Sequence, residues 1–362
     1  MPGLIVRWRL AAVSLAVGAI GGSVFAWLHA PLPWMLGPIF AIAVCNLRGA
    51  GLTVPGSVRR GGQWIVGCVL GLYFTAEAVG RMLSLGPALA LATLLSVLLG
   101  LVFAWALMRF GKADAPTAFF GGAIGGASEM LVQGERNGAS TQLIAAGHTL
   151  RLIIVITVIP FGLAAFGIRG DEAWTPTLQQ PFDLQGAALL VLVTGLAALI
   201  AQRLDVPNSW VLGPLFAAAL LAYFGAPVGA MPRIVINLGQ LLLGVAIGSR
   251  FAPDFFRVAP RYLSVMALSA LVGIAGALLL AWGLSLYSSI RVPTLLLAVA
   301  PGGVAEMALT AKVLQLGVPV VTAFQVMRVV AVLMTVGSLY RALARRFGWR
   351  TGKQTGKQSG HR

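Results

Sequence analysis

The chain has 362 residues, of which 58% are hydrophobic and only 10% charged, and its formal net charge is +16. Soluble domains carry about 25% charged residues, and a single soluble core cannot bury this much apolar surface, so the composition excludes a soluble globular protein. The apolar runs are solid rather than alternating, which excludes a membrane β-barrel. We therefore expect an all-α polytopic membrane protein.

The positive charge does not indicate nucleic-acid binding. Nucleic-acid binders gather basic residues on one folded face or motif, whereas here the basic residues separate the apolar runs. Seven of the 26 Lys and Arg residues lie in residues 341–362. We interpret residues 346–362 as a disordered, basic cytoplasmic tail that rests on anionic lipids of the bilayer.

The first predicted element is an apolar helix over residues 11–28, preceded by Arg7 and Arg9. This order resembles a secretory signal. The apolar stretch is long for a signal core, however, and the next apolar segment follows almost at once. We interpret it as an uncleaved first helix that begins in the cytoplasm.

The apolar segments then follow in two sets of six. They centre near residues 19, 40, 68, 97, 124 and 156 in the first half, and near 193, 217, 243, 275, 303 and 331 in the second. A helix needs about 20 apolar residues to cross the hydrocarbon layer. The fifth segment of each set is glycine-rich, contains a glutamate and is a poor helix former, so we predict that it is re-entrant or broken.

Four motifs occur twice in the same order. They pair Trp34-Met35-Leu36-Gly37-Pro38 with Trp210-Val211-Leu212-Gly213-Pro214, Gly62-Gln63 and Gly67 with Gly239-Gln240 and Gly244, Gly125-Gly126-Ala127-Ser128-Glu129 with Gly302-Gly303-Val304-Ala305-Glu306, and Arg151 with Arg328. The last three pairs share one offset, the 177 residues between Gly62 and Gly239, and the first differs by one. We predict a duplicated unit, with the first repeat over residues 1–168, a linker over 169–184 and the second repeat over 185–345.

The Leu-Gly-Pro pairs predict a kink in both halves, because Pro38 and Pro214 are expected to interrupt their helices. Trp34 and Trp210 lie four residues before these prolines, and they are candidates for anchors at the membrane interface.

Basic loops indicate how the repeats are oriented. Lys and Arg accumulate on the cytoplasmic side of short loops. The loop after the second segment has three basic residues in the first half and one in the second, and the loop after the third has one and then three. Equivalent loops thus exchange sides. We predict inverted repeats, each with about five transmembrane helices and one re-entrant or broken segment, and cytoplasmic termini in a bacterial inner membrane.

Glu129 and Glu306 are the first candidate site residues. A charged carboxylate in an apolar segment costs about 2.5 kcal/mol or more on insertion scales, and persists where it is paired, protonated or facing water. The preceding glycines, Gly125 and Gly126 with their counterparts Gly302 and Gly303, permit irregular backbone. Such backbone at membrane depth lines substrate sites in secondary transporters.

Arg151 and Arg328 each follow a glutamate by 22 residues, the interval from Glu129 to Arg151. They would bind an anionic substrate, or form buried ion pairs with the glutamates that only fix helix packing; the sequence leaves both alternatives open. The secondary candidates are His148, Gln63, Gln240 and Ser128. His148 is either a proton relay or a satisfied interior side chain, and its counterpart Gln325 excludes a symmetric histidine role. Gln63 and Gln240 fit helix–helix hydrogen bonds better than substrate contacts.

The duplicated Gly-Gly-x-Ser/Ala-Glu-Met and Trp-x-Leu-Gly-Pro motifs resemble those of the AbrB-type duplicated bacterial membrane proteins, over about residues 10–345. That family is labelled both a regulator of gene expression and an ammonia monooxygenase, and it is distinct from the small soluble DNA-binding regulators also called AbrB. The resemblance implies an inner-membrane protein, with Glu129, Glu306, Arg151 and Arg328 as its motif residues.

The residues argue against both labels in their literal sense. A copper monooxygenase needs several imidazole ligands, and the three histidines, His29, His148 and His361, lie far apart in the sequence. No DNA-reading motif is present. We expect neither an enzyme nor a metal or organic cofactor. The leading hypothesis is a gradient-coupled transporter of a small anionic or carboxylate-bearing solute, with H⁺ or Na⁺ as the coupling ion; the alternative is a membrane-embedded small-molecule sensor. A homo-oligomer is compatible with either.

Overall fold

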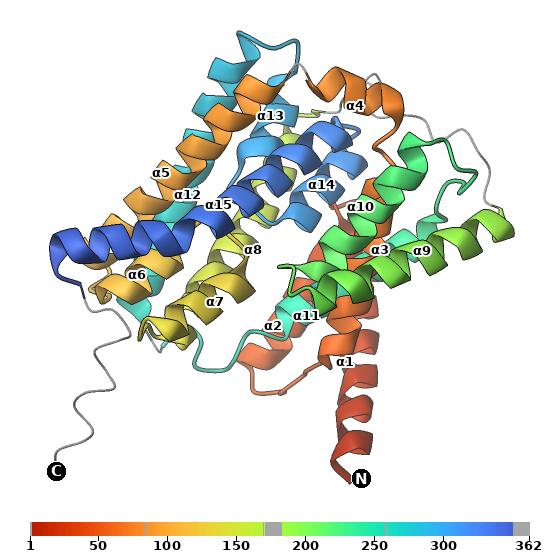
Figure 1. Cartoon of the computed structure of the whole chain (residues 1–362). Coiled ribbons are helices and arrows are strands. Elements are labelled where there is room, and N and C mark those ends of the chain that lie inside the picture. Colours follow the sequence, from red (N-terminus) through yellow and green to blue (C-terminus); the bar gives the residue numbers. More distant parts are fainter. Residues whose placement is uncertain (1, 84, 169, 171–182, 258, 350–362) are drawn as a thin grey trace. The chain divides into compact units, whose positions relative to one another are not determined.

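The computed structural model describes residues 2–83, 85–168, 170, 183–257 and 259–349. These residues form α-helices joined by turns, with no β-strand among them. Six helices are long and apolar enough to cross a membrane (Figure 1): α1 (Pro2–Trp27), α5 (Gly86–Arg109), α8 (Thr141–Ala165), α9 (Leu184–Arg203), α12 (Pro260–Ser285) and α15 (Val318–Phe347). The chain is therefore an all-α polytopic membrane protein, as its composition predicts.

Shorter helices connect these six. Three are apolar, namely α2 (Pro33–Leu47), α10 (Ser209–Tyr223) and α11 (Arg233–Gly248). The others are α3 (Gly56–Gly71), α4 (Ala76–Leu83), α6 (Ala115–Gly122), α7 (Ala127–Arg136), α13 (Val292–Val299) and α14 (Val304–Val313). Helix α4 has no counterpart among the segments predicted from the sequence, because it is short and carries Glu77 and Arg81 rather than a long apolar run.

The helices gather into two compact units, each of which takes segments from both halves of the chain. The first unit contains Met1–Gly86, Thr157–Phe255 and Val304–Thr322, and the second contains Pro87–Ile156, Phe256–Gly303 and Ala323–Arg362. These units are defined by contacts in space, whereas the predicted repeats are defined by motifs along the chain. The repeats therefore stay a prediction. Most of the predicted linker, and all but residues 346–349 of the predicted tail, lie outside the described residues.

In the first unit, glycines let helices approach closely. Gly37 of α2 lies so near α1 that an added Cβ would collide with the carbonyl oxygen of Gly21. An added Cβ at Gly67 of α3 would stand 2.5 Å from the carbonyl oxygen of Val211 in α10, and one at Gly244 of α11 would stand 2.5 Å from that of Met35 in α2. Small residues at such crossings allow backbone-to-backbone packing between membrane helices. The two Trp-x-Leu-Gly-Pro motifs therefore serve helix packing in this unit.

The prolines do not break their helices, and the predicted kink stays a prediction. Helix α2 runs from Pro33 to Leu47 through Pro38, and α10 runs from Ser209 to Tyr223 through Pro214. Each proline is the sixth residue of its helix, so the amide hydrogen that it lacks removes a single bond from the second turn. The strained backbone lies just before each helix instead, because Leu32 and Asn208 adopt positive φ values of 46° and 54°.

In the second unit, α6, α7 and α15 share an apolar core. Phe119 and Phe120 of α6 pack against Tyr340 of α15, with ring centroids 5.2 and 5.0 Å from the tyrosine ring. Met130 of α7 is fully buried in the same cluster. This core fixes the two short helices α6 and α7 against a long one, and it holds the gap between them in place.

Candidate functional site

Each glycine-rich segment is broken into two short helices. Helices α6 and α13 have 8 residues each, and α7 and α14 have 10 each. Immediately after α6 and α13 the backbone turns extended, with ψ values of 135° at Ala123 and 144° at Ala300. Four residues then separate the helices of each pair, residues 123–126 and 300–303. This is the interruption that the glycine-rich composition predicts.

The broken ends leave backbone groups without helical partners. A helix end exposes carbonyl groups that need other donors, and water is scarce at membrane depth. Arg151 of α8 donates from Nη1 to the carbonyl oxygens of Ala123 at 3.1 Å and Gly122 at 3.4 Å. Its side chain is only 4% exposed. A cation beside the negative end of a helix dipole is also electrostatically favourable, so Arg151 caps α6.

Arg328 of α15 caps α13 in the same way. It donates from Nη1 to the carbonyl oxygen of Ala300 at 2.5 Å and from Nη2 to that of Gly302 at 2.6 Å. It is likewise 4% exposed. The guanidinium groups of both arginines thus lie at the ends of broken helices. The sequence predicted only that the arginines belong to the sixth apolar segments.

His148 and Gln325 complete the two caps. Nε2 of His148 lies 2.9 Å from the carbonyl oxygen of Phe120, and its Nδ1 lies 3.0 Å from Nη2 of Arg151. Nε2 of Gln325 donates to the carbonyl oxygen of Leu297 at 2.8 Å, and its Oε1 accepts from Nη2 of Arg328 at 2.6 Å. The amide therefore makes the same kinds of contact as the imidazole. From residue types alone, Gln325 excluded a symmetric role for His148. The symmetry lies in the hydrogen-bond donors and acceptors, which the two side chains share.

The glutamates begin the second helix of each pair. Glu129 and Glu306 lie in the first turns of α7 and α14, where the positive end of the helix dipole favours a carboxylate. The Glu129 side chain folds back over Gly126, since an added Cβ there would meet Oε2 of Glu129. That oxygen is buried and has no hydrogen-bond partner. Ser128, the secondary candidate directly before Glu129, is exposed.

Glu129 and Arg151, both in the second unit, form neither an ion pair nor a hydrogen bond in the described part of the chain. The arginine instead donates to two carbonyl groups and to His148. Glu306 belongs to the first unit, where it is buried and the charge of Arg250 acts on it. Since Arg328 belongs to the second unit, the pairing of Glu306 with Arg328 stays a prediction.

The second unit concentrates positive charge. Arg151 and Arg328 are close enough for their like charges to interact. Within the described residues, no carboxylate is hydrogen-bonded to either guanidinium, and Nε of Arg328 is buried without a partner. Buried charges are normally compensated by a partner of opposite sign. This part of the unit therefore favours a negatively charged group.

The two glutamines lie on the packed helices of the first unit. Gln63 donates from Nε2 to Oδ1 of Asn208 at 2.9 Å, which is the helix–helix hydrogen bond that the sequence favours. Gln240 is 4% exposed, and its Oε1 is buried without a partner. The residue that corresponds to Asn208 in the other half is Leu32, which has no polar side chain. The two glutamines therefore differ in their hydrogen bonds despite their matching positions.

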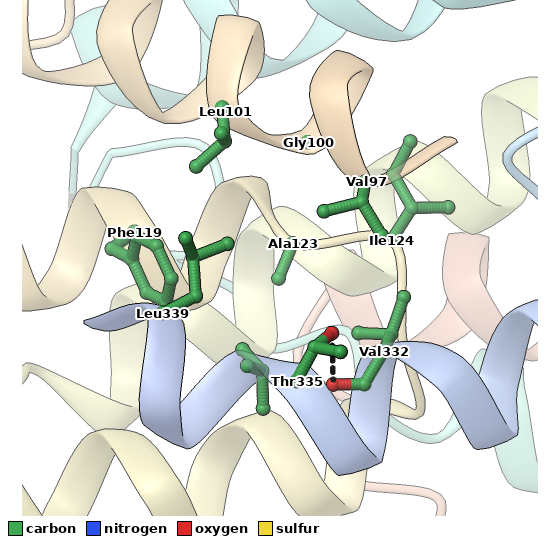
Figure 2. A pocket seen from close by; sticks show the side chains of 10 residues that line it. Val97, Gly100, Leu101, Phe119, Ala123, Ile124, Val332, Thr335 and Leu339 are labelled. Carbon is green, nitrogen blue, oxygen red and sulfur yellow. Dashed lines mark hydrogen bonds between the residues drawn. The ribbon is translucent and has the colours of Figure 1, made fainter. Parts of the chain in front are cut away.

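A small pocket lies in the second unit between α5, the α6–α7 gap and α15. Figure 2 shows Ala123 and Ile124 of the gap facing this space, with Val97 of α5 and Val332 of α15 beside them. Thr335 is its one hydroxyl-bearing residue, and that hydroxyl donates within α15 to Ala331. No charged side chain lines the pocket, so it is apolar. It adjoins the Arg151 cap at Ala123, whose carbonyl oxygen accepts from Arg151.

Comparisons with known proteins agree with the motifs. A family model described as "Transition state regulatory protein AbrB" matches residues 34–344. The protein named "Uncharacterized protein YhjN" from Bacillus subtilis (strain 168) is 29% identical over 357 residues, which covers 92% of this chain and 93% of that protein. The protein named "Putative regulator AbrB" from Escherichia coli (strain K12) is 25% identical over 346 residues, covering 94% of this chain and 97% of that protein.

Proposed function

Because the chain belongs to the AbrB family of membrane proteins, we propose that it is a gradient-coupled secondary transporter of a small anionic, carboxylate-bearing solute in the bacterial inner membrane. Glu129 and Glu306 carry the coupling ion, H⁺ or Na⁺. Any effect on gene expression is then indirect, through the concentration of the transported solute.

The observation that carries this proposal is the buried, unpartnered Oε2 of Glu129 at a helix break. Had the glutamate served only to neutralise Arg151, the two would form an ion pair, but the arginine binds carbonyl groups instead. No group of the described chain compensates this oxygen, which leaves it available to a coupling ion. A carboxylate oxygen that can take up and release an ion inside the membrane is what gradient coupling requires.

The preference for an anionic solute rests on Arg151 and Arg328. Both guanidinium groups are buried, and their like charges interact in one unit. A bound carboxylate would compensate this charge and hydrogen-bond to the guanidinium groups. Broken helices whose ends face a substrate are the recurring site of secondary transporters, which supports placing the solute at these caps.

We also propose that the two halves are inverted repeats with cytoplasmic termini. Matching helix lengths support a duplication, since α3 and α11 have 16 residues each and α2 and α10 have 15 each. The exchange of basic residues between equivalent loops supports the inversion.

A membrane-embedded sensor is the second candidate, favoured by the name of the Escherichia coli relative, "Putative regulator AbrB". Transport and sensing differ in net flux. Liposomes that contain the purified protein, screened with small radiolabelled carboxylates under an imposed pH gradient or Na⁺ gradient, should accumulate one of them. An ionophore that collapses the driving gradient should abolish the accumulation. Specific binding of a carboxylate without accumulation would favour the sensor.

A further inference from the structure

Tyr262 of α12 places a hydroxyl beside the Arg151 cap. Its side chain is 2% exposed, and the hydroxyl oxygen is buried with no hydrogen-bond partner. Among buried polar side chains such a group is unusual, because losing hydration without gaining a partner is costly. Phenylalanine would supply the same ring without that cost. The unpartnered hydroxyl is therefore a candidate hydrogen-bond donor to a bound ligand.

Two glycines seat this hydroxyl. An added Cβ at Gly147 of α8 would stand 2.9 Å from the hydroxyl oxygen, and one at Gly121 of α6 would collide with it. Gly147 directly precedes His148, and Gly121 directly precedes Gly122, whose carbonyl group accepts from Arg151. The hydroxyl is therefore held against both elements that make the cap.

Charges of both signs act on Tyr262: that of Arg151, and that of Asp114, whose carboxylate caps the N-terminus of α6. Tyr262 and Arg151 interact electrostatically, and the charge of Arg328 acts on Arg151 in turn. A tyrosine hydroxyl and an arginine N–H group are both hydrogen-bond donors. A ligand that satisfies them must bring acceptor atoms and negative charge, which describes a carboxylate.

We propose that the Tyr262 hydroxyl donates a hydrogen bond to the carboxylate of a small solute bound beside Arg151. This inference rests on the proposed function, because it assigns a recognition residue and a substrate class to the same site. The neutral donor adds specificity: it gains a bond from an oxygen acceptor in the correct place, whereas the guanidinium charges attract any anion.

The test uses the purified full-length chain in detergent, with thermal unfolding measured against sodium acetate, pyruvate, succinate and citrate. Sodium chloride and sodium phosphate at equal ionic strength serve as comparisons. At least one carboxylate should stabilise the native chain, and Tyr262→Phe should bind it about tenfold more weakly or worse, as expected for a lost hydrogen bond to a charged group. Its stability without carboxylate should be equal or higher, because the unpartnered hydroxyl is gone.

Tyr340→Phe is the matched control, since Tyr340 is also buried in the second unit but packs in the aromatic core. It should leave the affinity for the carboxylate unchanged. If Tyr262→Phe does not fold, Gly147→Ala displaces the hydroxyl while keeping it, and should weaken binding in the same way. Unchanged affinity in the foldable variant, equal stabilisation by chloride or phosphate, or no stabilisation by any of the four carboxylates would overturn the proposal.

Flux separates this inference from the proposed function. Tyr262-dependent binding without accumulation in liposomes would leave the recognition residue in place and remove transport. Accumulation of a carboxylate with the same apparent affinity in the native chain and in Tyr262→Phe would support transport and remove Tyr262 as a recognition residue.

Discussion

Arg151 donates a hydrogen bond from Nη2 to Nδ1 of His148 across 3.0 Å. A guanidinium group can only donate, so Nδ1 carries no hydrogen. The carbonyl oxygen of Phe120 can only accept, so Nε2 carries one. The imidazole is therefore neutral in this arrangement. Gln325 offers the same acceptor and donor to Arg328 and Leu297, which makes an amide a natural replacement for the imidazole.

His148→Gln should consequently preserve the cap, whereas His148→Leu should not. The leucine variant leaves a donor of Arg151 and the carbonyl oxygen of Phe120 unpaired, at a cost of about 1–3 kcal/mol for each group. Thermal unfolding of the purified variants checks this. Equal stability of the glutamine and leucine variants would show that the two hydrogen bonds at His148 contribute nothing to folding.

The arginine caps lead to a second prediction, which distinguishes them from ion pairs. Glu129→Gln and Arg151→Gln should have additive effects on stability, within about 0.5 kcal/mol, because no hydrogen bond joins the two side chains in the described part of the chain. Arg151→Gln alone should be strongly destabilising, since the carbonyl groups of Gly122 and Ala123 lose their donor. A double-mutant cycle measures the coupling. Recovery of stability in the double variant would indicate a hidden Glu–Arg pair.

Helix packing in the first unit gives a third prediction. Gly37→Ala should be destabilising by at least about 1 kcal/mol, since its Cβ would collide with the Gly21 backbone and force α1 and α2 apart. Gly195→Ala on α9 is the control, because an added Cβ there meets nothing within 4 Å. It should be neutral or slightly stabilising through its higher helix propensity. Thermal unfolding of both variants decides whether this crossing is as tight as described.

A fourth prediction concerns topology. In a chain lacking Cys45 and Cys68, a cysteine at Ala259, just before α12, should resist membrane-impermeant maleimide in intact cells and react after lysis. Inverted repeats place this loop, with Arg250, on the cytoplasmic side. A cysteine at the exposed Phe224, after α10, should react in intact cells. Labelling at position 259 in intact cells would mean twelve crossings and remove the inversion.

The sequence predicted the class of fold and the broken segments well. Composition and solid apolar runs are sufficient for a helical membrane protein. Gly125 and Gly126, placed directly before Glu129, predict a break because they weaken the helix beside a charge that lipid does not tolerate. The same pattern recurs at Glu306. Arg151 and Arg328 were identified as candidates because each follows one of these glutamates at the same interval.

The contacts of those residues could not be predicted. Arg151 and Glu129 have opposite charges, so the sequence favoured their pairing or a shared ligand, but the carbonyl groups that compete for the arginine have no signature in residue types. Tyr262 was missed because it has no polar counterpart: the residue 177 positions earlier is Leu85. The unbroken helices at Pro38 and Pro214 depended on the position of each proline within its helix, which requires knowing where the helix begins.

The central claim, that the two glutamates carry the coupling ion, is tested most directly by flux in liposomes that compares Glu129→Gln and Glu306→Gln with Glu135→Gln. Glu135 is exposed on the same helix as Glu129 and serves as the matched control. Each of the first two variants should fold normally, bind the carboxylate, and lose gradient-driven accumulation between about pH 5 and 8, while Glu135→Gln keeps it. Full accumulation by a folded Glu129→Gln or Glu306→Gln variant over that pH range would contradict the claim.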